Sequence, residues 1–299
     1  MAPLNAEAAL RRLMETRLPA VNTAGCHFSP VQGLTGESWR IDGAGITLLA
    51  RQHSAEKRAL GVSRRREAQV LRRCAPGLGP RVFAQNNQWL ILEWLEGDVV
   101  TIAEFDALNQ RGELAAMVAT LHRRPLSGYR LDLRRQFLRY WQQLDTRRLT
   151  PAWLRLQRHF LRSALPRPLH LAPLHMDIHP GNLLATGEGL RLIDWEYAAD
   201  GDVALDIAAL FRSNGWSAER QQRFLQHYAR QDYHDIARLQ AQVRRWLPWV
   251  DYLMLLWFEV RWQQSGDVEF LRWGAALRRR FITIRILNEH NEVRCPWAQ

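Results

Sequence analysis

The alternation of apolar and polar positions changes character at about residue 95 of the 299. Before that point it follows the two-residue period of strands in several short segments, which glycine, proline and asparagine separate. A helical period replaces it only at residues 5–17 and 56–73, and Pro76 and Gly77 end the second of these segments. The predicted strands cover residues 33–41, 46–51, 81–84 and 89–94.

From about residue 101 the apolar positions recur with a helical period almost throughout. Pro248 interrupts the longest segment, and the only strand-like material is a hairpin over residues 183–193. The pattern predicts an α+β chain with two lobes: a small antiparallel sheet with one main helix at residues 1–94, and a larger, mainly helical lobe at residues 95–299. The predicted helices of the second lobe cover residues 108–122, 133–144, 151–163, 204–212, 218–230, 236–262 and 268–286.

Three polar residues around this hairpin have the spacing of a phosphoryl-transfer site. The run His175-Met-Asp-Ile-His-Pro-Gly-Asn182 precedes the hairpin, and Leu192-Ile-Asp-Trp-Glu-Tyr-Ala198 follows it. Because a hairpin folds the chain back, it would bring Asp194 beside Asn182. Asp177 could then accept the proton of a hydroxyl group, while the oxygens of Asn182 and Asp194 suit Mg²⁺ between the phosphates of ATP. We therefore expect Asp177 to be the catalytic base and the other two to be metal ligands.

The histidines and a further acid near this motif leave alternatives open. We expect His175 to support the loop by hydrogen bonding rather than to react. Asp206 could cap the helix that follows or anchor the catalytic loop. The run from His175 to His179 also offers ligands for a zinc hydrolase, but the remaining histidines lack the spacing of further ligands, which argues against that chemistry.

The positive charge of the chain invites a nucleic-acid interpretation that its distribution does not favour. There are 41 Lys and Arg against 30 Asp and Glu, a formal net charge of +11, and Lys57 is the only lysine. An RNA-binding surface would gather its cations in a stripe among exposed aromatic residues, whereas these arginines are spread over most of the predicted helices. We therefore expect no nucleic-acid partner. The excess charge should help to attract an anionic nucleotide.

Cysteine spacing and the start of the chain bear on location. Cys26, Cys74 and Cys295 share no close spacing, so they predict neither a zinc site nor a disulfide framework, which suits a reducing cytoplasm. The first residues include an acid and lack the apolar segment of a signal peptide. The most apolar stretch, residues 252–258, is far shorter than the roughly 20 residues that a spanning helix requires. We expect a cytoplasmic protein with no membrane partner.

The motifs together resemble one family. The patterns H-x-D-x-x-x-x-N, I-D-W-E-Y-A and G-D-x-x-x-D-I-A, at residues 175–182, 193–198 and 201–208, are similar to those of the aminoglycoside/choline phosphotransferase superfamily, which is related to protein kinases. Residues 242–246 and 257–262 resemble its bacterial thiamine kinase branch. The resemblance implies a bilobal protein-kinase-like fold, ATP and Mg²⁺ as cofactors, and a small-molecule alcohol as substrate.

The same resemblance implies a nucleotide site in the first lobe. Kinase-like folds usually place a lysine on the third strand, paired with a glutamate on the next helix, to hold the phosphates. Here Arg51 ends that strand, and Glu67 is its expected partner. The backbone from Glu93 to Leu95 would hold adenine. A glycine-containing loop would cover the phosphates, and its expected contacts are Gly33, Thr35, Gly36 and Ser38.

Thiamine, the acceptor that the resemblance implies, is an aromatic cation with a hydroxyethyl group, so its pocket should combine aromatic faces with negative charge. Tryptophan is often simply packed in a core, which makes the acids more informative than the indoles. The expected acceptor-site residues are Trp195, Glu196, Trp249, Asp251, Trp257 and Glu259. Two rivals remain: a kinase of another amino alcohol such as choline or ethanolamine, and a non-catalytic nucleotide- or RNA-binding protein.

Overall fold

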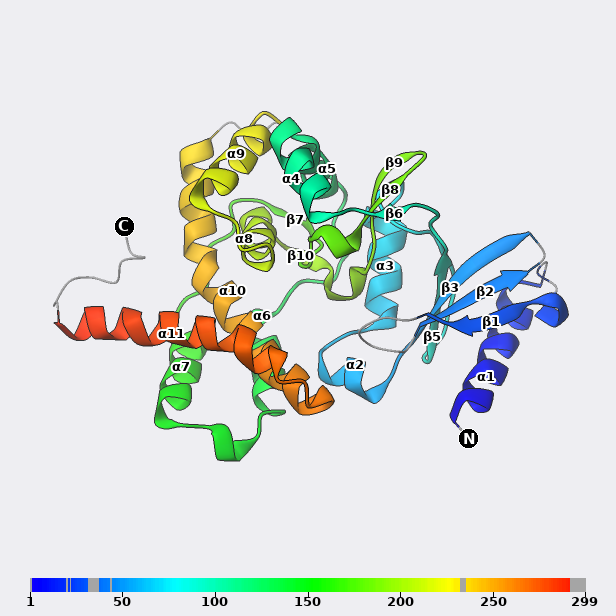
Figure 1. Ribbon diagram of the computed structural model, residues 1–299, viewed down its shortest axis with the longest axis horizontal. Coiled ribbons are helices and arrows are strands. Elements are labelled where there is room, and N and C mark those ends of the chain that lie inside the picture. The colour runs from blue at the N-terminus through cyan, green and yellow to red at the C-terminus, as the bar shows by residue number, and fades with distance from the viewer. Residues whose placement is uncertain are drawn as a thin grey trace.

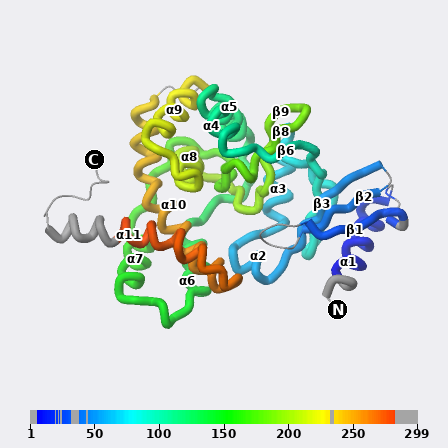
Figure 2. Tube along the Cα trace, viewed as in Figure 1, coloured from blue at the N-terminus to red at the C-terminus, as the bar shows by residue number. Residues whose placement is uncertain are grey.

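Two lobes lie side by side in the computed structural model, with the largest sheet in one lobe and most of the helices in the other (Figure 1). Figure 2 traces the same path, from the blue amino-terminal helix to the yellow and orange helices of the second lobe. Within the described part of the chain, no helix is both long and apolar enough to cross a membrane. The structure describes residues 2–19, 21, 23–31, 38–43, 45–231 and 235–290.

A five-stranded antiparallel sheet forms most of the amino-terminal lobe, in the order β1-β2-β3-β5-β4. The four predicted strands all form, and β1 precedes them. The helix α1 (Ala2–Arg17) buries Leu10 and Met14 against the apolar face of this sheet, in a small core of its own. The strands are β1 (His27–Pro30), β2 (Ser38–Gly43), β3 (Ile46–Gln52), β4 (Val82–Gln85) and β5 (Trp89–Glu93).

The single helix predicted over residues 56–73 is wrong, because the chain forms α2 (Ala55–Ala59) and α3 (Arg64–Cys74) instead. Gly61 lies between them with φ of +83°, a conformation that side-chain-bearing residues rarely adopt. Ser63 then begins the second helix by accepting a hydrogen bond from the backbone N–H of Arg66. The break leaves a short helix between strand β3 and the main helix of the lobe.

The carboxy-terminal lobe contains the predicted helices and more strand than expected. The hairpin of β8 (Leu183–Thr186) and β9 (Gly189–Leu192) is confirmed, and β6 (Asp98–Val99) pairs with β8. The expectation that the hairpin would be the only strand material is wrong, since β7 (Leu171–Leu174) and β10 (Ala199–Asp202) form a second antiparallel pair. These strands have four residues each, too few to establish a two-residue period against the helical background.

The helices of this lobe follow the predicted order, with two corrections. The single helix predicted over residues 108–122 is wrong, because Gly112, with φ of +84°, separates α4 (Ile102–Arg111) from α5 (Glu113–His122). The interruption expected at Pro248 is also wrong, because α10 continues through that residue. The 3₁₀ turns of the described chain are η1 (Thr23–Gly25), η2 (Thr146–Arg148), η3 (Pro180–Asn182) and η4 (Trp195–Tyr197). The α-helices are α4 (Ile102–Arg111), α5 (Glu113–His122), α6 (Leu133–Trp141), α7 (Pro151–Arg162), α8 (Val203–Ser213), α9 (Ala218–Ala229), α10 (Ile236–Ser265) and α11 (Glu269–His290).

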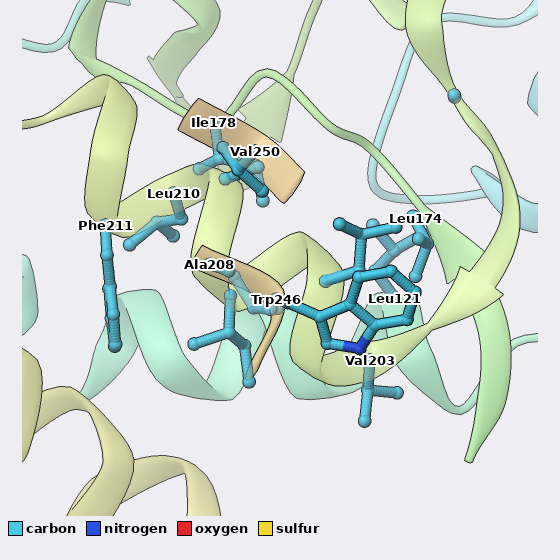
Figure 3. Close-up of a cluster of buried hydrophobic side chains, with 14 of the residues drawn as sticks. Leu121, Leu174, Ile178, Val203, Ala208, Leu210, Phe211, Trp246 and Val250 are labelled. Atoms are coloured by element: carbon cyan, nitrogen blue, oxygen red, sulfur yellow. The ribbon is translucent and has the colours of Figure 1, made fainter. Parts of the chain in front are cut away.

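The main core of the helical lobe lies around α8, which packs against α10 and the β7–β10 pair. Figure 3 shows part of this core, where Leu174 and Ile178 lie with Val203, Trp246 and Val250. Leu174 and Ile178 flank the loop at residues 175–177, and both are buried. The core therefore holds both ends of the loop that carries the catalytic motif.

Candidate active site

The loop that carries Asp177 is fixed by one buried carboxylate. Asp206, on α8, accepts hydrogen bonds from the backbone N–H groups of His175 (3.0 Å) and Met176 (2.6 Å). Met176 has φ of +69°, so this clasp holds the chain in a conformation that is uncommon for a residue with a side chain. Asp202, not Asp206, caps α8. Of the two roles that the sequence left open, anchoring of the catalytic loop is confirmed.

His175 ties the same loop to the hairpin. Its Nε2 lies 3.0 Å from the carbonyl oxygen of Ile193, and its ring packs edge-on against Trp195. Burial lowers the pKa of this imidazole, and the nearby carboxylates of Asp206 and Asp194 only partly oppose that effect. The predicted supporting role of His175 agrees with these contacts.

The hairpin brings Asn182 and Asp194 together. Leu183 pairs with Leu192 at the base of the two strands, and the N–H of Ile193 donates to the carbonyl oxygen of Asn182 at 3.0 Å. The side-chain amide of Asn182 donates to the backbone oxygen (3.0 Å) and to Oδ2 (3.1 Å) of Asp177. Asp177, Asn182 and Asp194 are separated in the sequence, but the hairpin brings them to one place in the structure, as the motif predicts.

The donor atoms at this convergence suit a magnesium ion. The Oδ1 atom of Asn182 and the Oδ2 atom of Asp194 have no hydrogen-bond partner among the described residues, so both are free to ligate. Mg²⁺ typically takes one or two protein oxygens and completes its octahedron with water and phosphate oxygens. Within the described chain no group of three His, Cys, Asp or Glu side chains is placed to hold a metal ion.

Behind the metal ligands lies a buried group of charged residues that we call the catalytic ion cluster. Arg51 joins three carboxylates: Nη1 lies 2.8 Å from Glu67, and Nη2 lies 2.7 Å from Asp194 and 2.9 Å from Glu196. The predicted pairing of Arg51 with Glu67 is thus present in the geometry. The members of the cluster are Arg51, Lys57, Arg64, Glu67, Asp194 and Glu196.

Burial and the charges of the cluster shift the pKa values of Asp177 and Asp194 in opposite directions. Burial, followed by the negative charges of Asp194 and Glu196, raises the pKa of Asp177 to about 7. Burial would also raise the pKa of Asp194, but the cations of Arg51 and Lys57 outweigh it and lower the value to about 2. One carboxylate is therefore poised to exchange a proton near neutral pH, while the other stays charged.

The remaining predicted nucleotide contacts are placed in part. Ser38 pairs with Arg51 across β2 and β3, which sets it beside the ion cluster. Glu93 ends β5 and its carboxylate accepts a hydrogen bond from the N–H of Arg81, while Leu95 follows where the chain passes between the lobes. The other predicted loop residues, Gly33, Thr35 and Gly36, lie outside the described residues.

The predicted acceptor residues separate into two groups. Glu196 lies in the ion cluster and Trp257 donates a hydrogen bond from Nε1 to the hydroxyl oxygen of Tyr197 at 2.9 Å. Tyr197 is close enough to the site for the charges of Glu196 and Asp177 to add to the rise in its pKa that burial causes. Trp257 therefore reaches the neighbourhood of the base through Tyr197.

The other group makes contacts away from the base. Trp195 is buried and donates to the carbonyl oxygen of Leu192, and Trp249 stacks on Phe137 at 6.2 Å in the core. These contacts favour the packing alternative for both indoles.

The two acids of the late helix are paired with arginines instead of facing an open pocket. Asp251 pairs with Arg212 (Nη2 to Oδ2, 3.0 Å), and Glu259 forms two hydrogen bonds with Arg148, at 3.0 and 3.1 Å. We call these contacts the α10 ion pairs. Their negative charge is already compensated.

Three residues of the site were not predicted from the sequence: Lys57, Arg64 and Tyr197. Lys57 bonds to Glu196 at 2.7 and 2.9 Å, and its status as the only lysine was the available signal. Tyr197 belongs to the I-D-W-E-Y-A motif itself, but its contact with Trp257 spans 60 positions and has no signature in the sequence.

Sequence comparison relates the chain to known phosphotransferases. Residues 30–246 match the model of the phosphotransferase enzyme family. The chain is 38% identical to thiamine kinases of Escherichia coli O157:H7 and Shigella flexneri, and each match covers 82% of this chain and 88% of the relative.

Solved structures share the fold at low sequence identity. The choline kinase LicA of Streptococcus pneumoniae superposes with a TM-score of 0.69 at 17% identity, covering 93% of this chain and 98% of that one. A Plasmodium vivax ethanolamine kinase does so with a TM-score of 0.71 at 16% identity, covering 91% and 86%. The predicted bilobal kinase-like fold is thereby confirmed. With a family model that spans most of its length and relatives this similar, the chain belongs to the phosphotransferase enzyme family.

Proposed function

We propose that this protein is a thiamine kinase, which transfers the γ-phosphoryl group of ATP to the hydroxyl group of thiamine with the help of Mg²⁺. The observation that carries the proposal is the convergence of Asp177, Asn182 and Asp194 in front of the catalytic ion cluster, in a chain 38% identical to thiamine kinases. The buried free thiol of Cys74 suits the reducing cytoplasm that we propose as its location.

The residues divide the work of phosphoryl transfer between positioning and charge. Asp177 would hold the hydroxyl group of thiamine and take up its proton as the new O–P bond forms, a role that suits a pKa of about 7. Arg51 would donate to phosphate oxygens from a guanidinium that Glu67 keeps in place. Mg²⁺, held by Asn182 and Asp194, would neutralise charge on the phosphates. Little covalent help is needed, because such transition states are loose.

The acceptor side is built from aromatic groups and the base itself. The indole of Trp257 and the phenol of Tyr197 are joined by a hydrogen bond, and Tyr197 directly follows Glu196 of the ion cluster, so both rings can face an aromatic cation there. Asp251 and Glu259 contribute little attraction, because arginines already neutralise them. We therefore propose that the negative charge that attracts the thiamine cation comes from the carboxylates of the catalytic centre.

An acceptor panel tests this proposal. ADP release from Mg·ATP is measured with thiamine, choline, ethanolamine and an aminoglycoside, each over a range of concentrations. We expect kcat/KM for thiamine to exceed that for the others by about 100-fold or more. A preference for choline or ethanolamine would keep the phosphotransferase chemistry and refute the acceptor. ATP binding without ADP release for any acceptor would favour the non-catalytic alternative.

A further inference from the structure

One residue of the catalytic ion cluster is chemically distinct from every other cation in the chain. Lys57 is the only lysine among 41 basic residues, so arginine fills the other 40 positions. Its side chain is only 4% exposed, although lysine is among the residues least often buried. Lysine ends in a compact ammonium group and arginine in a planar guanidinium group. The two groups differ in what they can bind, most of all at a buried position.

Contacts from the helical lobe fix the short helix that carries this lysine. Ser54 caps α2 at its start, and the carbonyl oxygen of Leu60 just beyond its end accepts hydrogen bonds from Gln136 (2.9 Å) and Tyr140 (3.2 Å) of α6. Gln264, at the end of α10, donates to the carbonyl oxygen of Glu56 at 3.2 Å. Lys57 therefore reaches the catalytic centre from a helix that is bonded to the lobe carrying Asp177.

The ammonium group has bonding capacity left over. It has three N–H donors, yet within the described chain its only hydrogen-bond partner is the carboxylate of Glu196, at 2.7 and 2.9 Å. Glu196, the partner of Lys57, also lies 2.9 Å from Nη2 of Arg51, and the same nitrogen lies 2.7 Å from the proposed metal ligand Asp194. The group thus lies close to the reacting centre with at least one hydrogen to donate.

The arginines of the cluster are more fully engaged. Arg51 divides its guanidinium among Glu67, Asp194 and Glu196, and Arg64 bonds to Glu67 (2.6 Å) and to the backbone oxygen of Gln52 (3.1 and 3.2 Å). Three cations face three carboxylates, so the cluster has no surplus positive charge of its own. A bound nucleotide adds negative charge and needs donors that are not already committed.

We propose that Lys57 is a further phosphate-binding residue, whose ammonium stays on Glu196 and donates its remaining hydrogen to a terminal phosphate oxygen of bound ATP. The assignment rests on the proposed ATP-dependent activity but not on the identity of the acceptor. Arg51 and Lys57 then share the role that one third-strand lysine has in other kinase-like folds, with Arg51 fixed by the sheet lobe and Lys57 by the helical lobe.

The lone lysine makes a direct labelling test possible. An ATP analogue with an acyl group on its γ-phosphate is incubated with the full-length protein and Mg²⁺, and the acylated peptides are mapped by mass spectrometry. The Nζ atom attacks the acyl carbon, an amide bond forms, the bond between the acyl group and the phosphate oxygen breaks, ATP leaves, and the released protons pass to water. In this chain only Lys57 and the α-amino group can form such an amide.

We expect acylation of Lys57, lowered about tenfold when ATP is present at about ten times its Kd, and α-amino acylation that ATP does not change. The Asp177→Asn variant should be labelled like the wild type, because labelling does not require transfer to an acceptor. Absence of acylation at Lys57, or acylation that ATP does not lower, would overturn the proposal even if thiamine is turned over. Labelling without thiamine turnover would leave the proposal standing and refute only the acceptor.

Substitutions give a second, kinetic test. Lys57→Gln should lower kcat by about 100-fold, as expected for removal of one donor to the transferred group. Lys57→Arg keeps the charge but not the compact ammonium, so we expect about a tenfold loss. Arg58→Gln is the matched control, because Arg58 lies on the exposed side of the same helix, and its kcat should stay within about twofold of wild type. Full activity in Lys57→Arg would show that only the ion pair matters and would overturn the phosphate contact.

Discussion

The catalytic ion cluster and the α10 ion pairs combine the same residue types in different proportions. In the cluster three cations face three carboxylates, and within the described chain the nearby base Asp177 has no arginine or lysine partner. On α10, Glu259 has two arginine partners, Arg148 and Arg278. Among the acids of the cluster Asp194 opens to solvent, with a side chain that is 37% exposed, whereas Glu67, Glu196 and the α10 acid Glu259 are 0%, 4% and 6% exposed.

This difference separates acids that can attract a ligand from acids that stabilise packing. A carboxylate with two guanidinium partners has no charge left for a cationic substrate, and removing it leaves buried cations behind. Asp194 shares its one guanidinium partner, Arg51, with two other carboxylates, and Asp177 has no arginine or lysine partner within the described chain, so these two acids retain negative charge that a metal ion or a cationic acceptor can balance. Equivalent substitutions in the two places should therefore have different consequences.

The largest effect is expected for Glu196→Gln. It removes the partner of Lys57 and one partner of Arg51 in a buried site, so kcat should fall by at least about 100-fold and the free energy of unfolding by about 3 kcal/mol. Steady-state kinetics and urea unfolding measure the two effects. Glu188→Gln, in the exposed turn between β8 and β9, is the matched control, and its kcat should stay close to the wild-type value. Wild-type turnover in Glu196→Gln would contradict a catalytic role for the cluster.

The pH dependence follows from the base. Burial and the charges of Asp194 and Glu196 raise the pKa of Asp177 to about 7, and only the deprotonated carboxylate can accept a proton. We expect kcat/KM for thiamine to rise about tenfold per pH unit below pH 7 and to level off above it. His179 lies 3.8 Å from Asp177, and burial lowers the pKa of its imidazole. His179→Gln is therefore the control and should keep the same rise in kcat/KM below pH 7. If the rise in kcat/KM below pH 7 disappears in His179→Gln, the group responsible for it is His179 and not Asp177.

A smaller effect is expected for Trp257→Phe. The substitution keeps an aromatic ring and removes the hydrogen bond to Tyr197, which should raise KM for thiamine about three- to tenfold with kcat nearly unchanged. KM for ATP serves as the internal control and should not change. If KM for thiamine is unaffected while the melting temperature falls, Trp257 is a packing residue and the proposed acceptor wall is wrong.

The smallest kinetic effect is expected for Glu259→Gln, even though the sequence analysis placed this residue in the acceptor site. The loss of its bonds to Arg148 should lower the free energy of unfolding by about 1–3 kcal/mol. KM for thiamine should remain within about twofold of wild type, because the acid is already neutralised. A tenfold rise in KM at unchanged stability would restore Glu259 as a thiamine contact.

Local signals were enough to predict the hairpin and the site that it assembles. The alternation over residues 183–193 implies a reversal of the chain, and a reversal there can only bring Asp194 towards Asn182. The division into a sheet lobe and a helical lobe followed for the same reason, since the period of the apolar positions changes from two to 3.6 residues near residue 95.

Long-range pairing explains what could not be predicted. Arg51 and Asp194 are 143 positions apart, and Lys57 and Glu196 are 139 apart, so no local pattern connects them. The aromatic and acidic residues of α10 have the composition of a cation pocket, but their partners Arg148 and Arg212 lie on other elements of the helical lobe. The helix break at Gly61, which gives Lys57 its position, depends on a single left-handed residue within an otherwise helical pattern.

Phosphorus NMR of a reaction of Mg·ATP with thiamine tests the central claim most directly, with wild type and Asp177→Asn compared at equal concentration. Wild type should form a new phosphomonoester in step with ADP, and the variant should be slower by about 1,000-fold. The variant should also melt no lower than wild type at pH 8, because a raised pKa means that ionised Asp177 destabilises the folded state above pH 7. Product formation by the variant at the wild-type rate, or release of inorganic phosphate alone by wild type, would contradict the account.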